Sequence, residues 1–151
     1  MLTQEEQNII DQSIDILTRH YKREDFLATS PEGVKNFCQL KMGLLEHEVF
    51  GCLFLDSKHQ LIKFVEMFRG TVGGLSVYPR EVVKESLMCN AAAVVFTHNH
   101  PSGDTDPSTA DIETTNRLCE ALQQFEVRVL DHIIVSRISS YSFAEKGLNL
   151  G

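Results

Sequence analysis

The sequence predicts a mixed fold of the α/β (α+β) class, with helices covering a β-sheet in three layers. Segments with helical spacing of apolar residues alternate with short apolar runs that are typical of strands. Two of these runs are joined by a polar turn, which adds an antiparallel pair to the sheet. With 151 residues, of which 42% are hydrophobic and 23% charged, the chain has the size and composition of a globular domain.

Two helices are expected before the first strand. Thr3 and Glu6 have the spacing of a capping box, and apolar residues follow at helical intervals, which predicts a helix over about 4–21. Ser30–Glu32 predicts a second helix start, because proline suits the first helical position and a carboxylate suits the positive helix end. The residues expected to face the core from this helix are Val34, Phe37, Cys38 and Leu40.

A hairpin is expected next. Val49–Leu55 is a continuous apolar run, which is typical of a strand buried on both faces, so we expect it inside the sheet and away from its edges. Asp56–His59 predicts the turn and Gln60–Phe68 the antiparallel partner. The glycine-rich loop Arg69–Gly74 lacks the lysine and the spacing of a phosphate-binding loop.

The rest of the chain alternates helix and strand. The elements expected are a helix over 80–88 that begins beside Pro79, a strand over 91–96, a helix over 108–125, a strand over 127–136 and a short strand near Tyr141. No internal repeat or low-complexity segment interrupts them. This order predicts an N-terminal helical extension over 1–28 and one domain over 29–151.

Composition limits the expected partners and compartment. With 21 acidic and 14 basic residues, the net charge is -7, so we expect neither strong nucleic-acid binding nor membrane association. The four cysteines are far apart and form no C-x-x-C pair, so reduced thiols are expected. The N-terminus lacks the basic and apolar regions of a signal peptide, which predicts a cytoplasmic protein. The oligomeric state is not readable from these features.

A histidine pair at the end of a predicted strand indicates a metal site. His98 and His100 lie two residues apart, so in extended backbone both side chains point the same way. Asp111 is the third residue of the helix that Ser108 begins, where it can supply a third ligand. Two histidines, one carboxylate and an open position suit zinc better than magnesium. The same residue types form the facial triad of non-haem iron proteins, so the residues leave iron open.

Each of these residues also has a purely structural interpretation. Ser108 and Asp111 have the spacing of a plain helix cap. The two histidines could be loop residues, and Pro101 with Gly103 could only mark a turn. The combination of a strand, a histidine pair and an acid on the next helix favours the metal site.

The segment from His98 to Asp111 resembles the signature of JAB/MPN metalloproteases, the JAMM motif. His98-Asn99-His100-Pro101, six residues, Ser108, two residues and Asp111 match the pattern H-x-H-P-x6-S-x-x-D. Arg69-Gly70-Thr71 and Asp131-His132-Ile133-Ile134-Val135 resemble the bacterial RadC branch. The resemblance extends from about Ser30 to the C-terminus and implies the cytidine-deaminase-like three-layer fold of that family.

The resemblance also implies a function and a role for each site residue. One zinc ion per chain would be held by His98, His100 and Asp111, and zinc lowers the pKa of bound water from about 15.7 toward 7. Glu48, before the apolar strand, matches the glutamate that acts on this water; Glu46 is the less favoured register. Ser108 would donate a hydrogen bond to the tetrahedral intermediate. The protein is thus expected to be a zinc-dependent metallohydrolase, a peptidase or isopeptidase, with a peptide or protein substrate.

Two other functions stay open at this point. One is a non-catalytic scaffold that uses the metal site for folding or partner binding. The other is an accessory role in DNA repair, which the RadC name suggests; longer RadC-like proteins carry an N-terminal helix-hairpin-helix region, and only about 30 residues precede the matching portion here. Asp131 and His132 are expected to make structural hydrogen bonds in a core strand. The sequence does not identify the substrate.

Overall fold

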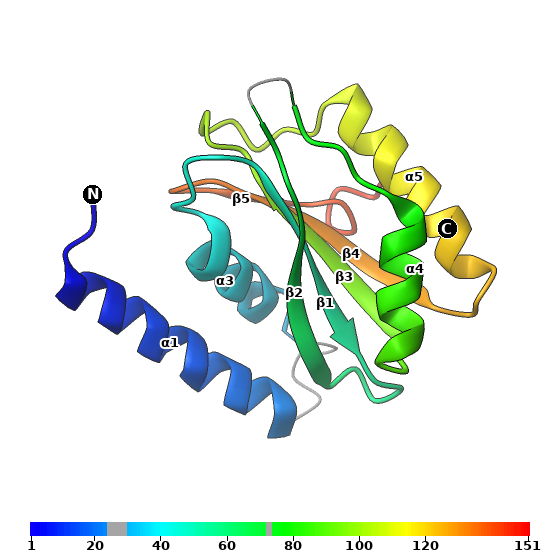
Figure 1. The fold of residues 1–151 in the computed structure, drawn as a ribbon, viewed down its shortest axis with the longest axis horizontal. Helices are drawn as coiled ribbons and strands as arrows, with labels where there is room; N and C mark the ends of the chain where they lie inside the picture. The colour runs from blue at the N-terminus through cyan, green and yellow to red at the C-terminus, as the bar shows by residue number, and fades with distance from the viewer. Residues whose placement is uncertain (24–29, 72–73) are drawn as a thin grey trace.

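A mixed β-sheet forms the middle layer of the molecule (Figure 1). The computed structural model describes residues 1–23, 30–71 and 74–151, and within them five strands pair in the order β2-β1-β3-β4-β5. Their bounds are β1 Val49–Leu55, β2 Leu61–Arg69, β3 Ala93–Asn99, β4 Arg128–Val135 and β5 Ser140–Ser142. β3 and β4 are parallel, and the other neighbours are antiparallel. β1 lies between β2 and β3, which confirms the prediction of an interior strand.

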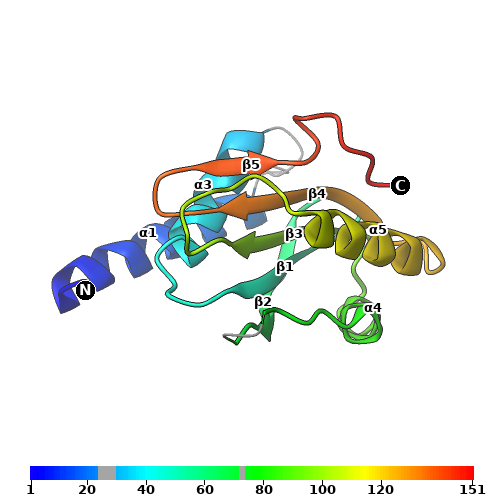
Figure 2. The same ribbon diagram turned by 90° about the horizontal axis from the view of Figure 1, so that it is seen from above.

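Helices cover both faces of this sheet. The helices of the described residues are α1 Gln4–Arg23, α3 Pro31–Met42, α4 Pro79–Met88 and α5 Thr109–Gln123. In Figures 1 and 2, α1 and α3 lie on one face, and α4 and α5 lie on the other. The predicted three-layer α/β architecture is therefore confirmed.

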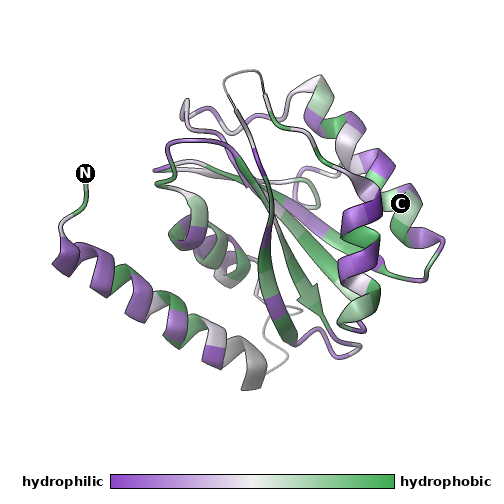
Figure 3. Cartoon of the chain, viewed as in Figure 1, coloured by the Kyte–Doolittle hydropathy of each residue, from purple (hydrophilic) through white to green (hydrophobic). Residues whose placement is uncertain are grey.

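Strand alternation divides the apolar side chains between two cores. Along β1, Val49, Leu53 and Leu55 pack in the cluster beneath α3, whereas Phe50, Cys52 and Phe54 pack in the cluster beneath α4 and α5. All seven residues of β1 are buried, as the continuous apolar run predicts. Figure 3 shows the same concentration of apolar residues along the strands.

The predicted helix starts are confirmed at three caps. Thr3 and Glu6 form a capping box, in which the Glu6 N–H donates to Thr3 Oγ1 at 3.2 Å and the Thr3 N–H donates to Glu6 Oε2 at 2.8 Å. Ser30 Oγ accepts the Gly33 N–H at 3.2 Å, ahead of Pro31 at the first position of α3. Ser108 caps α5, and its side chain accepts the Asp111 N–H. Of the residues expected to face the core from α3, Val34, Phe37 and Cys38 are buried, and Leu40 is only partly buried.

Several predicted ends of helices and strands are wrong, and the error at β3 matters most because this strand carries His98. The strand was expected over 91–96, but it continues through His98 and Asn99, because His98 pairs with Phe50 of β1 and Asn99 with Val135 of β4. α5 begins at Thr109 because Ser108 is its cap, and it ends at Gln123. The remaining corrections are one or two residues at the ends of α1, β2, α4 and β4.

The predicted boundary at residue 28 lies outside the described residues, and so do residues 72–73 of the glycine-rich loop. The division into 1–28 and 29–151 stays a prediction. In the described ranges, α1 packs on the domain through Ile14 and Leu17, which contact the core beneath α3. Among the described helices, none combines the length and the apolar composition that a bilayer crossing requires.

Candidate metal centre

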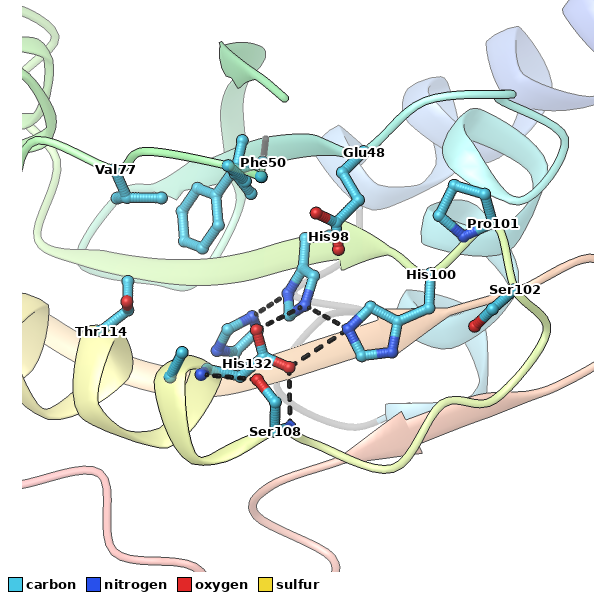
Figure 4. A pocket seen from close by; sticks show the side chains of 14 residues that line it. Glu48, Phe50, Val77, His98, His100, Pro101, Ser102, Ser108, Thr114 and His132 are labelled. Carbon is cyan, nitrogen blue, oxygen red and sulfur yellow. Dashed lines mark hydrogen bonds and ion pairs between the residues drawn. The ribbon is translucent and has the colours of Figure 1, made fainter. Parts of the chain in front are cut away.

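An open cleft of about 530 Å³ lies where β3 ends and α5 begins (Figure 4). Strand alternation places His98 on its floor, because Val94 and Phe96 of the same strand face α4 and α5. His98 is 2% exposed. His100 follows directly after β3, and its backbone N–H donates to Val135 O at 2.9 Å. The two Nε2 atoms are 2.9 Å apart, so the prediction that both rings point the same way is confirmed.

The cap of α5 directs Asp111 toward the histidines. Asp111 N–H donates to Ser108 Oγ at 3.0 Å, and Ser108 N–H donates to Asp111 Oδ2 at 2.9 Å. In this position Oδ1 lies 3.3 Å from His98 Nε2, and Oδ2 lies 3.1 Å from His100 Nε2. The helix-cap interpretation of Ser108 and Asp111 is therefore correct, and the same cap brings the carboxylate to the histidine pair.

The carboxyl group of Asp111 is held in its ionised form by its neighbours. Burial alone would raise the pKa of Asp111, but hydrogen bonds with His100 and His98 outweigh it and hold that pKa well below its usual range. The hydrogen bond with Asp111 in turn raises the pKa of His100. Asp111 is thus an ionised carboxylate at neutral pH, which is the form that binds metals.

Glu48 reaches the same cleft from the other side. A carboxylate oxygen of Glu48 and ring nitrogens of His98 and His100 all lie within 4.8 Å of one another, so these residues form a group that could hold a metal ion. In Figure 4 the Glu48 carboxylate points toward the two imidazole rings. Glu46, the alternative register, is exposed to solvent. The described residues therefore bring Glu48, His98, His100, Ser108 and Asp111 together around one cleft.

The chemistry of these groups fits a divalent metal. His100 Nδ1 lies 2.7 Å from Asp104 O, and a carbonyl oxygen only accepts, so Nδ1 carries a hydrogen. In the neutral ring Nε2 therefore presents a lone pair, and Nε2 donates to Asp111 only when the ring is protonated. Two imidazole nitrogens and one carboxylate are a common ligand set of zinc sites with an open position. A metal held here would face the cleft, where Glu48 lies.

Comparison with known proteins identifies the family. The model of the RadC-like JAB domain matches residues 28–148. The chain belongs to the RadC-like JAB domain family. The resemblance found in the sequence is thereby confirmed.

Relatives of this RadC-like JAB domain have two lengths. A UPF0758 protein of Vibrio cholerae is 50% identical over 142 residues, which cover 94% of this chain and 89% of the relative. The UPF0758 protein Mpe_A2695 of Methylibium petroleiphilum is 55% identical over 119 residues, which cover 79% of this chain and 54% of the relative. A Haemophilus influenzae relative is 47% identical over 141 residues, with 64% of its length covered. The chain thus spans most of the first relative and little more than half of the second.

Asn99 supports the cleft of this RadC-like JAB domain from the opposite face of the sheet, a role that was not predicted from the sequence. It is buried between the two histidines, and strand alternation directs its amide to the opposite face of the sheet. Oδ1 accepts the Val49 N–H at 2.7 Å, and Nδ2 donates to His47 O at 2.9 Å. These bonds hold the backbone on both sides of Glu48. The position of this asparagine between two histidines was the available indication in the sequence, but its partners lie about fifty residues away along the chain.

His132 also belongs to the site of the RadC-like JAB domain. The expected structural hydrogen bonds exist, and one partner is the predicted ligand His98, whose Nδ1 lies 2.7 Å from His132 Nε2. His132 Nδ1 lies 2.6 Å from Thr115 Oγ1. Burial lowers the pKa of His132 well below its usual value. Asp131 points elsewhere, because its carboxylate accepts from Ser142 Oγ and from backbone N–H groups.

Proposed function

We propose that this RadC-like JAB domain is a zinc-dependent metallohydrolase that cleaves an amide bond in a peptide or protein, as a peptidase or isopeptidase. The observation that carries the proposal is the meeting of two histidines and two carboxylates in one open cleft, where His98 Nε2, His100 Nε2 and Asp111 surround one position and Glu48 faces it. Bound zinc supplies a Lewis acid that polarises a carbonyl and acidifies water.

The chain's own residues have separate roles in this proposal. His98, His100 and Asp111 hold the metal. Glu48 accepts a proton from the attacking water and returns it to the amine nitrogen as the carbon–nitrogen bond breaks. Ser108 Oγ accepts the Asp111 N–H, which leaves its hydroxyl hydrogen able to donate to the substrate carbonyl oxygen as negative charge develops there.

The walls of the cleft support a peptide substrate. Phe50, Leu75, Val77 and Ala110 line it beside the polar residues. Apolar walls around a few polar groups are typical of sites that bind part of a ligand by its apolar side chains. A chain segment with an apolar side chain near the cleaved bond would suit this lining.

Metal content tests the ligand assignment. Protein purified without a histidine tag should contain about one zinc per chain by plasma mass spectrometry. Asp111→Ala should lose it, whereas Glu113→Ala, which removes an exposed acid from the same helix, should keep it. The same spectra measure iron, so iron in place of zinc would correct the metal. If neither metal binds after both are supplied, the proposal is wrong.

Hydrolysis tests the catalytic assignment. On a mixed peptide library, Glu48→Gln should lose turnover by about 10²-fold or more while keeping its zinc, because the proton acceptor is removed. The matched control Glu46→Gln changes an exposed glutamate two residues earlier and should leave turnover unchanged. Undiminished hydrolysis by Glu48→Gln would overturn the role of Glu48. A zinc-loaded wild type that cleaves nothing in the library would favour the non-catalytic scaffold.

We also propose that nucleic acid is not a principal partner, on the basis of the net charge of -7. Duplex DNA in fluorescence anisotropy at low salt should show no binding at micromolar protein. Binding that weakens steeply with salt would instead support a function on DNA.

A further inference from the structure

We propose that Thr115 and His132 are positioning residues that fix the tautomer of His98, so that His98 presents an unprotonated Nε2 to the cleft. The consequence for metal binding rests on the function proposed above. The tautomer itself can be tested without metal.

Three short contacts connect α5 to His98 through the interior. Thr115 Oγ1 lies 2.7 Å from Asp111 O, one turn earlier in α5. The same oxygen lies 2.6 Å from His132 Nδ1. His132 Nε2 lies 2.7 Å from His98 Nδ1. All three side chains are at most 2% exposed, so water does not compete for these bonds.

The first contact determines the direction of the whole chain of bonds. A carbonyl oxygen only accepts, so the single hydroxyl hydrogen of Thr115 is donated to Asp111 O. Thr115 Oγ1 must then accept from His132 Nδ1–H. A neutral imidazole carries one hydrogen, so His132 Nε2 accepts from His98 Nδ1–H. His98 Nε2 is left with a lone pair that faces the cleft.

The opposite direction conflicts with the geometry. It would require the Thr115 hydroxyl to donate to His132 Nδ1, which leaves lone pairs of Thr115 Oγ1 and Asp111 O facing each other at 2.7 Å. It would also put a hydrogen on His98 Nε2, the nitrogen that a metal in the cleft would need as a lone-pair donor. The favoured direction instead gathers three acceptors, from His98, His100 and Asp111, as a divalent cation requires.

Aromatic packing holds the intermediate ring in place. His132 stacks on Phe143 with 4.6 Å between ring centroids, and it makes edge contacts with Phe50 at 5.5 Å and Phe96 at 5.8 Å. Both predicted ligand histidines are thus oriented through Nδ1, His100 by the Asp104 carbonyl and His98 by His132.

Zinc affinity of matched variants tests the positioning role. Thr115→Val keeps the shape but removes the hydroxyl, so His132 can adopt the other tautomer; we expect about a tenfold loss of zinc affinity in chelator competition. Thr115→Ser keeps the hydroxyl and should bind close to wild type. His132→Phe should lose up to about 100-fold, and His132→Gln, whose amide oxygen can accept near the Nε2 position, should regain much of it. Thermal unfolding checks that each variant is folded.

The tautomers are measured directly by long-range ¹H–¹⁵N NMR of metal-free protein at about pH 8.5, above the usual histidine pKa of about 6.5. Nδ1–H on both His98 and His132 is the expected result. Nε2–H on either ring, or wild-type zinc affinity in folded Thr115→Val, would overturn the proposal. If the wild type takes up no metal, the proposed function fails, and the NMR pattern still decides the tautomer.

Discussion

The three consecutive residues His98, Asn99 and His100 place functional side chains on both faces of the sheet. The two imidazoles point to the cleft beside α5, and the Asn99 amide binds the backbone of His47 and Val49. Glu48 O also accepts the Gly70 N–H at 2.7 Å. The backbone of Glu48 is therefore fixed by β3 on one side and by the end of β2 on the other.

Asn99→Ala should destabilise the protein and loosen Glu48. The change leaves the Val49 N–H and the His47 carbonyl without their buried partner, which should cost about 1–3 kcal/mol of unfolding free energy. Urea unfolding measures this cost. The control Asn116→Ala removes an exposed asparagine from α5 and should change the unfolding free energy by less than about 0.5 kcal/mol. Equal values for the two variants would show that Asn99 does not hold this segment.

Thiol reactivity tests the burial of the cysteines. All four are free, and burial raises the pKa of Cys38 to about 12 and that of Cys119 to about 11. Burial also raises the pKa of Cys52, which is fully buried. Only Cys89 is partly exposed, so at about pH 8 native protein should show one reacting thiol with a chromogenic disulfide reagent, and unfolded protein four. Cys89→Ser should abolish the native reaction; fast labelling of that variant would contradict this burial pattern.

The sequence allowed some of these residues to be predicted, and the reasons differ. The spacing of His98 and His100 indicated a common direction through strand alternation, and the helix start indicated Asp111. Glu48 required the family resemblance, because about fifty residues separate it from the histidines. The partners of Asn99 and His132 depend on the pairing of β3 with β1 and β4, which no local pattern encodes.

At the scale of the elements, the fit of β1 against β2 depends on a missing side chain. A Cβ on Gly51 would lie 2.8 Å from Phe64 Cζ and 2.9 Å from Phe64 Cε2. Phe64 cannot move freely, because its ring packs edge-on against Phe37 of α3 with 5.8 Å between centroids. The glycine thus makes room for an aromatic ring of the neighbouring strand.

Gly51→Ala should therefore destabilise the sheet by about 1–3 kcal/mol, the usual cost of overpacking. Urea unfolding of a double-mutant cycle isolates the cause. In a Phe64→Leu background, the cost of Gly51→Ala should be clearly smaller, since the shorter side chain leaves space for the methyl group. The same cost in both backgrounds would mean that the clash with Phe64 is not responsible.

The elements themselves were largely predictable. β1 matches its predicted range because a continuous apolar run has clear ends, and α1, α3 and α5 begin where a capping side chain predicts them. α4 begins at Pro79 without a side-chain cap. The end of β3 was missed because His98 and Asn99 are polar. Their place in the strand results from hydrogen bonding to two neighbours and burial in a site, which outweigh the apolar pattern.

At the scale of the whole molecule, the side chains of α1 that contact the core, among those described, lie on one stripe of the helix. Ile14 and Leu17 contact the core beneath α3, whereas Ile9 and Ile16 are each 58% exposed. Ile14→Ala should therefore cost about 1–2 kcal/mol of unfolding free energy. Ile16→Ala, the same change two residues later, should cost less than about 0.5 kcal/mol. Equal costs in urea unfolding would mean that α1 does not pack in this way in solution.

The layers could be predicted from the sequence, but the order of the strands could not. Alternating helical and strand patterns indicate helices on a sheet. The placement of β3 between the antiparallel β1 and the parallel β4 depends on packing between distant segments. This order places Phe50, His98 and Ile134 side by side. It thereby also brings Glu48, two residues before Phe50, and His132, two residues before Ile134, to opposite sides of His98.

The two-sided use of His98-Asn99-His100 has a consequence for how the chain can change length. A single residue inserted between the histidines would turn one imidazole toward α3, and the asparagine would lose its place opposite Glu48. Local repacking can accommodate substitutions nearby, but it cannot restore the alternation of side chains between the two faces of the strand. Insertion scanning should consequently find that this stretch does not tolerate inserted or deleted residues, whereas the exposed turn at Ser57 and Lys58, at the other end of β1, should accept them.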